Sequence, residues 1–398
     1  MLFSSSQKSK MSLLVFLASG LGNAGGTMYL PALIAMSSSL HIAKETAQLS
    51  MSIYLISISL SQIFYGPLSD AFGRRINLLV GVALFIIGSL CCSLADSALL
   101  LISGRIIQGL GIGAANTVGF GLLRDLYSGN ALVKQLCSLS LFVGIMPIVA
   151  PIIGGYLVTY ISWRACFLAL GLFGIILLIL KIALLYETNL SPNTQAYKPK
   201  IVINNFMKLI KDKIFLGYVL SASMAFAILL TFNTMLPFVL IQDLNISPDV
   251  YGWLTIFTGL GYISGAYFGG KVSESLGLYR SLLTCVLIAA LSSILGLILA
   301  FINLSVASVL IPLIFLLVGV GMNIPLASGG AMKRFPEIAG SAGALLAICM
   351  FLCASLFTFI SSKTTNQYPW TMFSILLIMS VINFLITSTI KKDGESHV

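Results

Sequence analysis

Apolar stretches of about 20 residues or more recur along the whole chain, and each is long enough to cross a hydrocarbon core of about 30 Å. The composition agrees, because 58% of the 398 residues are hydrophobic, only 9% are charged, and the mean hydropathy is +1.03. A soluble protein carries about 25% charged residues, so this chain requires lipid as its solvent. We expect an all-α membrane protein with twelve spans, at residues 12–36, 46–66, 77–95, 98–122, 134–160, 163–186, 213–242, 250–272, 281–302, 305–330, 337–360 and 368–390.

The lysines and arginines of the short loops predict how the spans are oriented. With the N-terminus on the cytoplasmic side, eighteen of the 22 basic residues fall at inner ends, so we expect both termini in the cytoplasm. The net charge of +10 is then mostly an orientation signal. It is spread over seven cytoplasmic segments rather than clustered, which argues against nucleic-acid binding.

One polar stretch divides the spans six and six, and a loop motif recurs in both halves. The sequence therefore predicts an N-terminal six-helix bundle at 1–186, a cytoplasmic linker at 187–212 and a C-terminal six-helix bundle at 213–398. GPLSDAFGRR follows span two and GKVSESLGLYR follows span eight. Gly66, Ser69, Asp70 and Gly73 align with Gly270, Ser273, Glu274 and Gly277, each 204 residues later. A fixed shift of half the chain indicates a parallel duplication.

The repeated loop has a local physical interpretation. Gly66 and Gly73 permit a tight turn and a close approach of helices. Asp70 can accept hydrogen bonds from helix-start amides, and Arg74 and Arg75 hold the loop at the inner face. An ordinary solvated loop would explain the arginines but not the repeated spacing of glycine and acid.

Three motifs carry a family resemblance. GPLSDAFGRR resembles the loop motif G-x-L-[AS]-D-x-x-G-R-[RK] of the major facilitator superfamily, matched at Gly66, Leu68, Ser69, Asp70, Gly73, Arg74 and Arg75. RIIQGLGIGAA is similar to its fourth-span motif at Arg105, Gln108, Gly109, Gly111 and Gly113. GIMPIVAPIIGGYL is similar to the fifth-span motif of antiporters at Gly144, Pro151, Gly154 and Gly155, and departs from it at Ala150. The resemblance covers essentially the whole chain. It is strongest to the twelve-span drug:proton antiporters, in particular their bacterial bicyclomycin/chloramphenicol-resistance branch.

The resemblance implies a carrier of the bacterial cytoplasmic (inner) membrane, in which two six-helix bundles alternately open a midplane cavity to each side. It also implies that Asp70 helps to latch the inner gate in the outward-open state. Small residues and prolines in span five fit a gating helix, although ordinary helix packing would use the same residues. The expected gating residues are Gly66, Asp70, Gly73, Arg74, Arg75, Gly144, Pro147, Pro151, Gly154, Gly155 and Glu274.

Polar residues at helical spacing mark a candidate substrate cavity. Asparagine and glutamine are costly in lipid and favour a cavity face, whereas a single serine or threonine often bonds to its own helix backbone. The candidate substrate-binding residues are Asn23, Thr27, Tyr54, Arg105, Gln108, Asn116, Asn233 and Asn323.

Arg105 interrupts an apolar run, where a charge costs at least about 2.5 kcal/mol by insertion scales. One interpretation is that it packs span four against span one or reaches the outer interface. The other is that its guanidinium fork binds a carboxylate-bearing or zwitterionic substrate. On the second interpretation the preferred substrates are anionic, zwitterionic or neutral.

No acidic residue falls in the membrane interior. Relatives in the branch usually carry an acid immediately before MYLP, and here that position is Thr27. All twelve acids lie at the ends of spans or in tails, and the two histidines, His41 and His397, lie in a loop and a tail. Coupling to a proton is therefore implied by the resemblance alone.

The leading hypothesis is a secondary transporter that exports drugs or metabolites, with a proton as the coupling ion. The alternative within transport is movement of an anionic metabolite, such as a polycarboxylate siderophore, in either direction. A membrane-embedded enzyme would need an interior nucleophile and base or a metal cluster, and a receptor on a carrier fold would need a large extramembrane domain. We expect no catalytic residue, cofactor or metal site, and a monomer in the bilayer.

Overall fold

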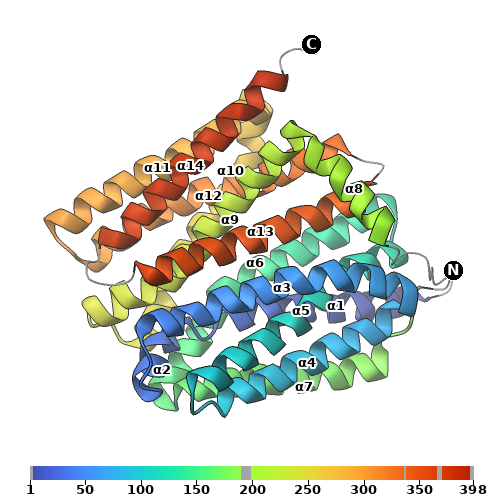
Figure 1. Cartoon of the computed structure of the whole chain (residues 1–398), viewed down its shortest axis with the longest axis horizontal. Coiled ribbons are helices and arrows are strands. Elements are labelled where there is room, and N and C mark those ends of the chain that lie inside the picture. Colours follow the sequence, from blue (N-terminus) through green and yellow to red (C-terminus); the bar gives the residue numbers. More distant parts are fainter. Residues whose placement is uncertain (1–2, 190–198, 336–337, 365–369, 395–398) are drawn as a thin grey trace. The chain divides into compact units, whose positions relative to one another are not determined.

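The computed structural model describes residues 3–189, 199–335, 338–364 and 370–394, and no strand occurs among them (Figure 1). The helices of the first half are α1 (Ser5–Thr27), η1 (Leu30–Ala32), α2 (Leu33–Ser39), α3 (Lys44–Phe72), α4 (Arg74–Ser93), α5 (Ala98–Leu126), α6 (Gly129–Tyr160) and α7 (Trp163–Leu184). Those of the second half are α8 (Pro199–Lys211), α9 (Lys213–Pro237), η2 (Phe238–Asp243), α10 (Pro248–Leu276), α11 (Leu278–Ile302), α12 (Val306–Arg334), α13 (Ala339–Lys363) and α14 (Trp370–Gly394).

Within these described residues, eleven helical segments are both long and apolar enough to cross a membrane. The remaining predicted span, 250–272, corresponds to α10, which has 29 residues and is as long as α3. Its most apolar membrane-length stretch is less hydrophobic than those of the eleven, because glycine, serine, threonine and tyrosine are frequent in it. The structure therefore supports an all-α multi-pass membrane fold.

The first predicted span is not one continuous helix. α1 already begins at Ser5, where Ser4 and Gln7 form a capping box. The α-helix then ends at Thr27, and the 3₁₀ turn η1 and α2 follow it. Pro31 lies in η1. Because proline has no N–H to donate, it favours a break at this point over continuation of the helix.

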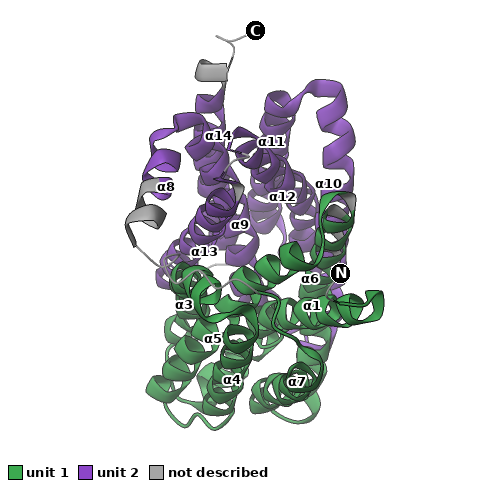
Figure 2. Cartoon of the chain, turned by 90° about the vertical axis from the view of Figure 1, so that its right-hand side faces the viewer, with its two compact units in different colours: residues 1–201 green, residues 202–398 purple. Residues whose placement is uncertain are grey.

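The chain forms two compact units, residues 1–201 and 202–398, coloured separately in Figure 2. The two units are built in the same way. In unit 1, α5 packs on α3 and α4, α4 packs on α7, and α1 packs on α5, α6 and α7. In unit 2, α12 packs on α10 and α11, α11 packs on α14, and α9 packs on α12, α13 and α14. The same packing in the same chain order supports the duplication that the loop motif predicts.

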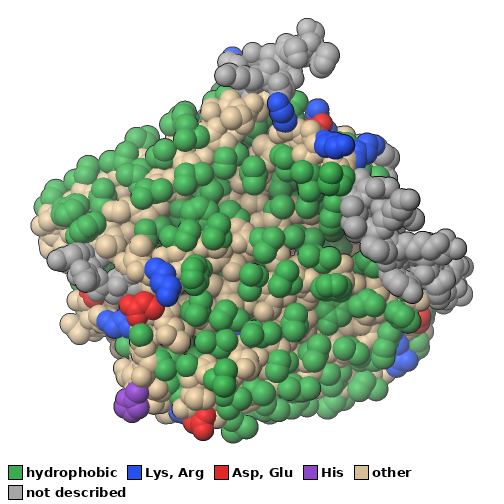
Figure 3. All heavy atoms as spheres, viewed as in Figure 1, with side chains coloured by type: hydrophobic (Ala, Val, Ile, Leu, Met, Phe, Trp, Pro, Cys, Tyr) green, Lys and Arg blue, Asp and Glu red, His purple; other side chains and the backbone are tan. Residues whose placement is uncertain are grey.

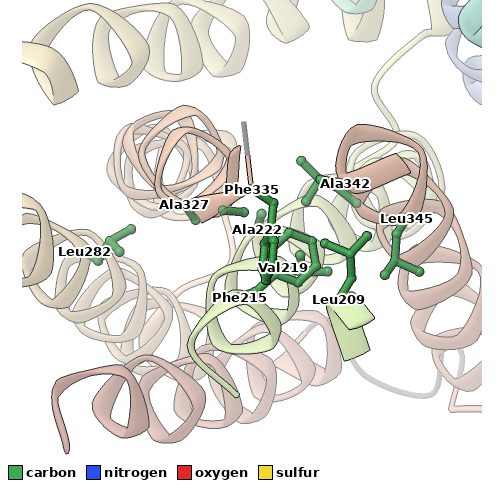
Figure 4. Close-up of a cluster of buried hydrophobic side chains, with 11 residues drawn as sticks. Leu209, Phe215, Val219, Ala222, Leu282, Ala327, Phe335, Ala342 and Leu345 are labelled. Carbon is green, nitrogen blue, oxygen red and sulfur yellow. The ribbon is translucent and has the colours of Figure 1, made fainter. Parts of the chain in front are cut away.

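Unit 2 has a core that includes part of the predicted linker. Leu209 of α8 is fully buried and lies in one apolar cluster with Phe215 and Val219 of α9 and Ala342 of α13 (Figure 4). The segment 187–212 thus contributes a helix that packs on unit 2. The predicted bundle boundaries at 186 and 213 remain a prediction, and residues 190–198 lie outside the described part of the chain.

Large apolar side chains cover much of the outer surface of the helices. The face drawn in Figure 3 is dominated by hydrophobic side chains, with few charged ones among them. Leu99 and Ile302, for example, expose about three quarters of their surface. Such a surface is stable in contact with lipid chains and not in contact with water.

Candidate functional site

Arg105 is fully buried inside unit 1, at 0% exposure. Its guanidinium carbon lies 4.2 Å from the ring centres of both Tyr29 and Tyr54. Its Nη1 donates to the Gly25 carbonyl at 2.9 Å and to Gln108 Oε1 at 2.8 Å. The Arg105 side chain, which extends from α5, is therefore enclosed by groups from α1, from the turn after α1 and from α3.

The groups around Arg105 are themselves fixed by hydrogen bonds. The Tyr54 hydroxyl donates to the Gly22 carbonyl at 2.7 Å, and the hydroxyls of Tyr29 and Ser50 share a hydrogen bond of 3.2 Å. Gln108 Nε2 donates to Ser89 Oγ of α4 at 2.7 Å. Four helices, α1, α3, α4 and α5, are thus joined through one cation.

No acid neutralises Arg105 in this network. An arginine stays charged in a protein, so its cost must be reduced by carbonyl oxygens and by the negative faces of aromatic rings. One nitrogen, Nη2, is buried and has no hydrogen-bond partner. The observed contacts are those expected if Arg105 packs span four against span one, and a contact with substrate remains a prediction.

The other predicted polar residues of unit 1 have no recorded hydrogen bond to Arg105 within the described part of the chain. Asn23 and Thr27 donate to carbonyls of their own helix, Ser19 O and Asn23 O, both at 2.9 Å. Asn116 is partly exposed on α5 and lies eleven residues after Arg105, which is about 16 Å along a helix. Tyr54 and Gln108 are the predicted residues that join Arg105 directly.

In unit 2, Asn323 of α12 belongs to a separate buried polar group. Ser221 of α9 shares hydrogen bonds with Asn323 at 3.3 Å and with Thr387 of α14 at 3.1 Å. Asn233 instead donates to the Leu229 carbonyl one turn earlier in α9. Asn323 therefore ties three helices of unit 2 together.

The buried charged side chains that the structure describes are all basic. Among the described residues, Arg105 and Lys181 are buried, and no aspartate or glutamate is. Lys181 Nζ has no hydrogen-bond partner. This agrees with the acid-free interior that the sequence predicts.

The repeated loop forms the turn between α3 and α4. Gly73 has a φ of +93°, a conformation that favours glycine, and its N–H donates to the Ser69 carbonyl. Arg74 pairs with Asp70 at 2.6 Å and with Asp125 of α5 at 3.2 Å. The Arg75 guanidinium donates to the Ile182 carbonyl of α7 at 3.0 Å. The predicted loop residues thus connect the ends of four helices.

The equivalent turn of unit 2 is simpler. Gly277 also has a positive φ, +78°, and lies between α10 and α11. Glu274 is exposed, and no ion pair of this residue is recorded within the described part of the chain. The repeat therefore preserves the backbone of the turn but not its charge network.

The glycine- and proline-rich stretch lies in α6, which stays helical across Pro147 and Pro151. An added Cβ at Gly154 would collide with the Met28 carbonyl, so α6 approaches the end of α1 closely there. Gly155 is buried, whereas Gly144 has open space around an added Cβ. Close packing therefore accounts for Gly154, and a gating role of this stretch remains a prediction.

Sequence reasoning missed four residues at the α3–α4 turn. Asp125 pairs with Arg74, Glu187 and Asn189 bind the same turn from the start of the linker, and Thr188 binds Asp125. In the sequence these residues are only polar positions after a span. They lie 50 residues or more from the loop, and nothing in their local pattern indicates their partners.

Comparisons with known proteins agree with this architecture. A family model described as "Major Facilitator Superfamily" matches residues 15–358. The chain is 28% identical over 372 residues to a bicyclomycin resistance protein homolog of Haemophilus influenzae, covering 92% of each chain. It is 30% identical over 339 residues to multidrug resistance protein D of Escherichia coli, covering 84% of each. Among solved structures, the xylose transporter XylE of E. coli in a partially occluded inward-open conformation superposes with a TM-score of 0.76 at 14% identity, over 99% of this chain and 100% of that one.

Proposed function

The chain belongs to the major facilitator superfamily, and we propose that it exports small organic molecules across the bacterial cytoplasmic membrane in exchange for protons. Two units with one packing plan carry this proposal, because alternating access needs two bundles that tilt against each other about a fixed site. The relatives named for bicyclomycin and multidrug resistance support efflux of drugs. Their resemblance also supports a role as a carrier rather than an enzyme.

We propose that the transported molecules are anionic, zwitterionic or neutral. The observation that supports this is a permanently charged arginine buried in unit 1, with no buried carboxylate among the residues described there. In a medium of low dielectric constant such a charge repels a cation over a longer distance than it does in water. Export or import of a polycarboxylate metabolite is the alternative that the same charge favours.

The orientation in the membrane belongs to the same proposal. Eighteen of 22 lysines and arginines fall at inner ends when both termini are cytoplasmic. The α3–α4 turn, with Arg74 and Arg75, then faces the cytoplasm, and the Arg105 network lies in the outer half of unit 1. We propose that the functional form is a monomer.

Transport in proteoliposomes tests the function. Purified protein is reconstituted, and flux of bicyclomycin is measured with and without an imposed pH gradient. We expect bicyclomycin flux above that of protein-free vesicles. The flux should be faster when the pH gradient drives protons in the direction opposite to the movement of bicyclomycin. Bicyclomycin flux equal to that of empty vesicles in both conditions would contradict drug export, and flux indifferent to the gradient would contradict proton coupling.

A further inference from the structure

The first residues of the linker cap the start of α4. Glu187 Oε1 accepts hydrogen bonds from the backbone N–H of Arg74 at 2.8 Å and Oε2 from that of Arg75 at 2.9 Å. Oε1 also accepts from the N–H of Thr188 and Asn189. The first amides of a helix have no partner within the helix, and Gly73, which precedes α4, has no side chain to offer one. Glu187 therefore supplies, from 113 residues away, the cap that α4 lacks.

The next two residues bind the neighbouring helix ends. Asn189 Nδ2 donates to the Asp70 carbonyl at 2.9 Å, at the end of α3. The Thr188 hydroxyl donates to Asp125 Oδ2 of α5 at 2.9 Å, and the same oxygen accepts from Arg74 Nε. Three consecutive residues, 187–189, thus hold the end of α3, the start of α4 and the end of α5.

Gly73 shows that the carboxylate has a fitted place. A Cβ added at Gly73 would lie 2.5 Å from Glu187 Oε2. A Cβ added at Gly277, the equivalent glycine of unit 2, would meet nothing within 4 Å. Both glycines have a positive φ, so backbone conformation alone does not explain the difference. The space over Gly73 is occupied by the acid of the linker.

We propose that residues 187–189 are a strap that positions the gating loop, with Glu187 as its positioning residue. Glu187 binds the backbone N–H of Arg74, and the Arg74 side chain pairs with Asp70, so the contact of Glu187 positions one partner of this pair. The start of the linker and the α3–α4 turn then move as one body during alternating access. This inference rests on the proposed transport function, since it concerns the gate of that transporter.

Amide hydrogen exchange of the full-length protein in lipid nanodiscs tests the strap without any substrate. We expect Glu187→Gln to speed exchange about tenfold in peptides that contain Arg74 and Arg75, because the amide presents an NH₂ group where Oε2 now accepts. Glu45→Gln is the matched control, since it removes the same charge from the first turn of α3 at its other end. Unchanged exchange at residues 74–75 in the Glu187 variant would overturn the capping.

A second variant tests the assigned contact between Glu187 and the backbone at Gly73. Gly73→Ala places a methyl group where the carboxylate lies and also strains the positive φ of this position, so it should raise exchange at residues 74–75 at least as much as Glu187→Gln does. The double variant should exchange no faster than Gly73→Ala alone, because both changes break the same contact. Additive effects of the two changes would overturn the assigned contact.

The link to gating has its own readout. If the strap sets the state of the gate, Glu187→Gln should also change exchange at the other end of α3. We expect a change of at least threefold in peptides covering residues 28–43, which connect α1 to the start of α3. A change confined to the α3–α4 turn would overturn the conformational role and leave a local cap only. Because no substrate is used, these outcomes do not depend on whether bicyclomycin is transported.

Discussion

At the residue scale, Arg105 shows how a membrane protein can bury a cation without an acid. The sequence identifies Arg105 as unusual because it interrupts an apolar run. It does not predict which groups enclose the guanidinium, since Gly25, Tyr29 and Tyr54 come from α1, from the turn after α1 and from α3, and they meet Arg105 only after the bundle forms. The enclosure depends on the planar shape of the guanidinium, because it contacts two aromatic rings and three hydrogen-bond acceptors, Gly25 O, Ser50 O and Gln108 Oε1, at once.

We expect Arg105→Lys to destabilise the protein by about 2–4 kcal/mol, since an ammonium cannot fill the space between two rings and leaves Gln108 without its present donor. Thermal unfolding in detergent measures the effect, with Arg280→Lys, an exposed arginine, as the control. A transition temperature equal to that of Arg280→Lys would contradict a packing role for the guanidinium.

Thr27 occupies the place where related transporters carry an acid. It is 4% exposed and donates to the carbonyl of Asn23 on its own helix. We expect Thr27→Asp to introduce a pH-dependent step into transport, or to shift selection toward cations, because it adds a titratable negative charge where no acid is buried among the described residues. Flux of bicyclomycin and of ethidium across a pH series measures this. A well-inserted variant that is indistinguishable from wild type would show that Thr27 does not face the transport path.

At the element scale, α5 is the helix around which unit 1 is packed. Its glycines allow backbone contact with two neighbours: a Cβ added at Gly109 would lie 2.6 Å from the Tyr54 carbonyl oxygen of α3, and one at Gly111 would lie 2.4 Å from that of Gly81 in α4. The sequence predicted the helices from their apolar length, and the glycines of α5 were singled out only as part of the fourth-span motif. It could not predict which helix each glycine meets.

We expect Gly109→Ala to destabilise the protein by about 1–3 kcal/mol through overpacking. Gly329→Ala in α12 is the matched control, because nothing lies within 4 Å of an added Cβ there, and alanine favours a helix. Thermal unfolding compares the two. Equal transition temperatures would show that α3 can move away from α5 at little cost.

The gating role of the α3–α4 turn was predicted from the family resemblance and the repeated acid, whereas the contacts of residues 187–189 with this turn were not predicted. The pair of Asp70 and Arg74 is partly exposed, and such a pair contributes only about 0–1 kcal/mol to stability. We therefore expect Asp70→Asn to lower bicyclomycin flux several-fold at nearly unchanged membrane abundance. Glu45→Gln is the control for loss of one acid. Wild-type flux at equal abundance would remove Asp70 from the gate.

At the scale of the whole molecule, the two units share one packing plan but differ in buried charge. Arg105 and Lys181 are both in unit 1, and no lysine or arginine is buried among the described residues of unit 2. The duplication was readable in the sequence because the loop motif repeats at a fixed shift. The difference in burial was not, because exposure depends on which helix faces the interior of its unit.

This asymmetry leads to a prediction about selectivity. A fixed positive charge without a buried counter-charge should disfavour cationic substrates, so cells that express the protein should resist bicyclomycin, which is uncharged, more than ethidium, which is a cation. Arg105→Lys keeps the charge and should keep that order even where activity falls, whereas Arg105→Gln removes the charge and should narrow the difference. Growth inhibition by both compounds in a strain lacking its own efflux pumps measures the order at equal membrane abundance. Greater resistance to ethidium that is the same in wild type and Arg105→Gln would show that the buried charge does not act on the transported molecule.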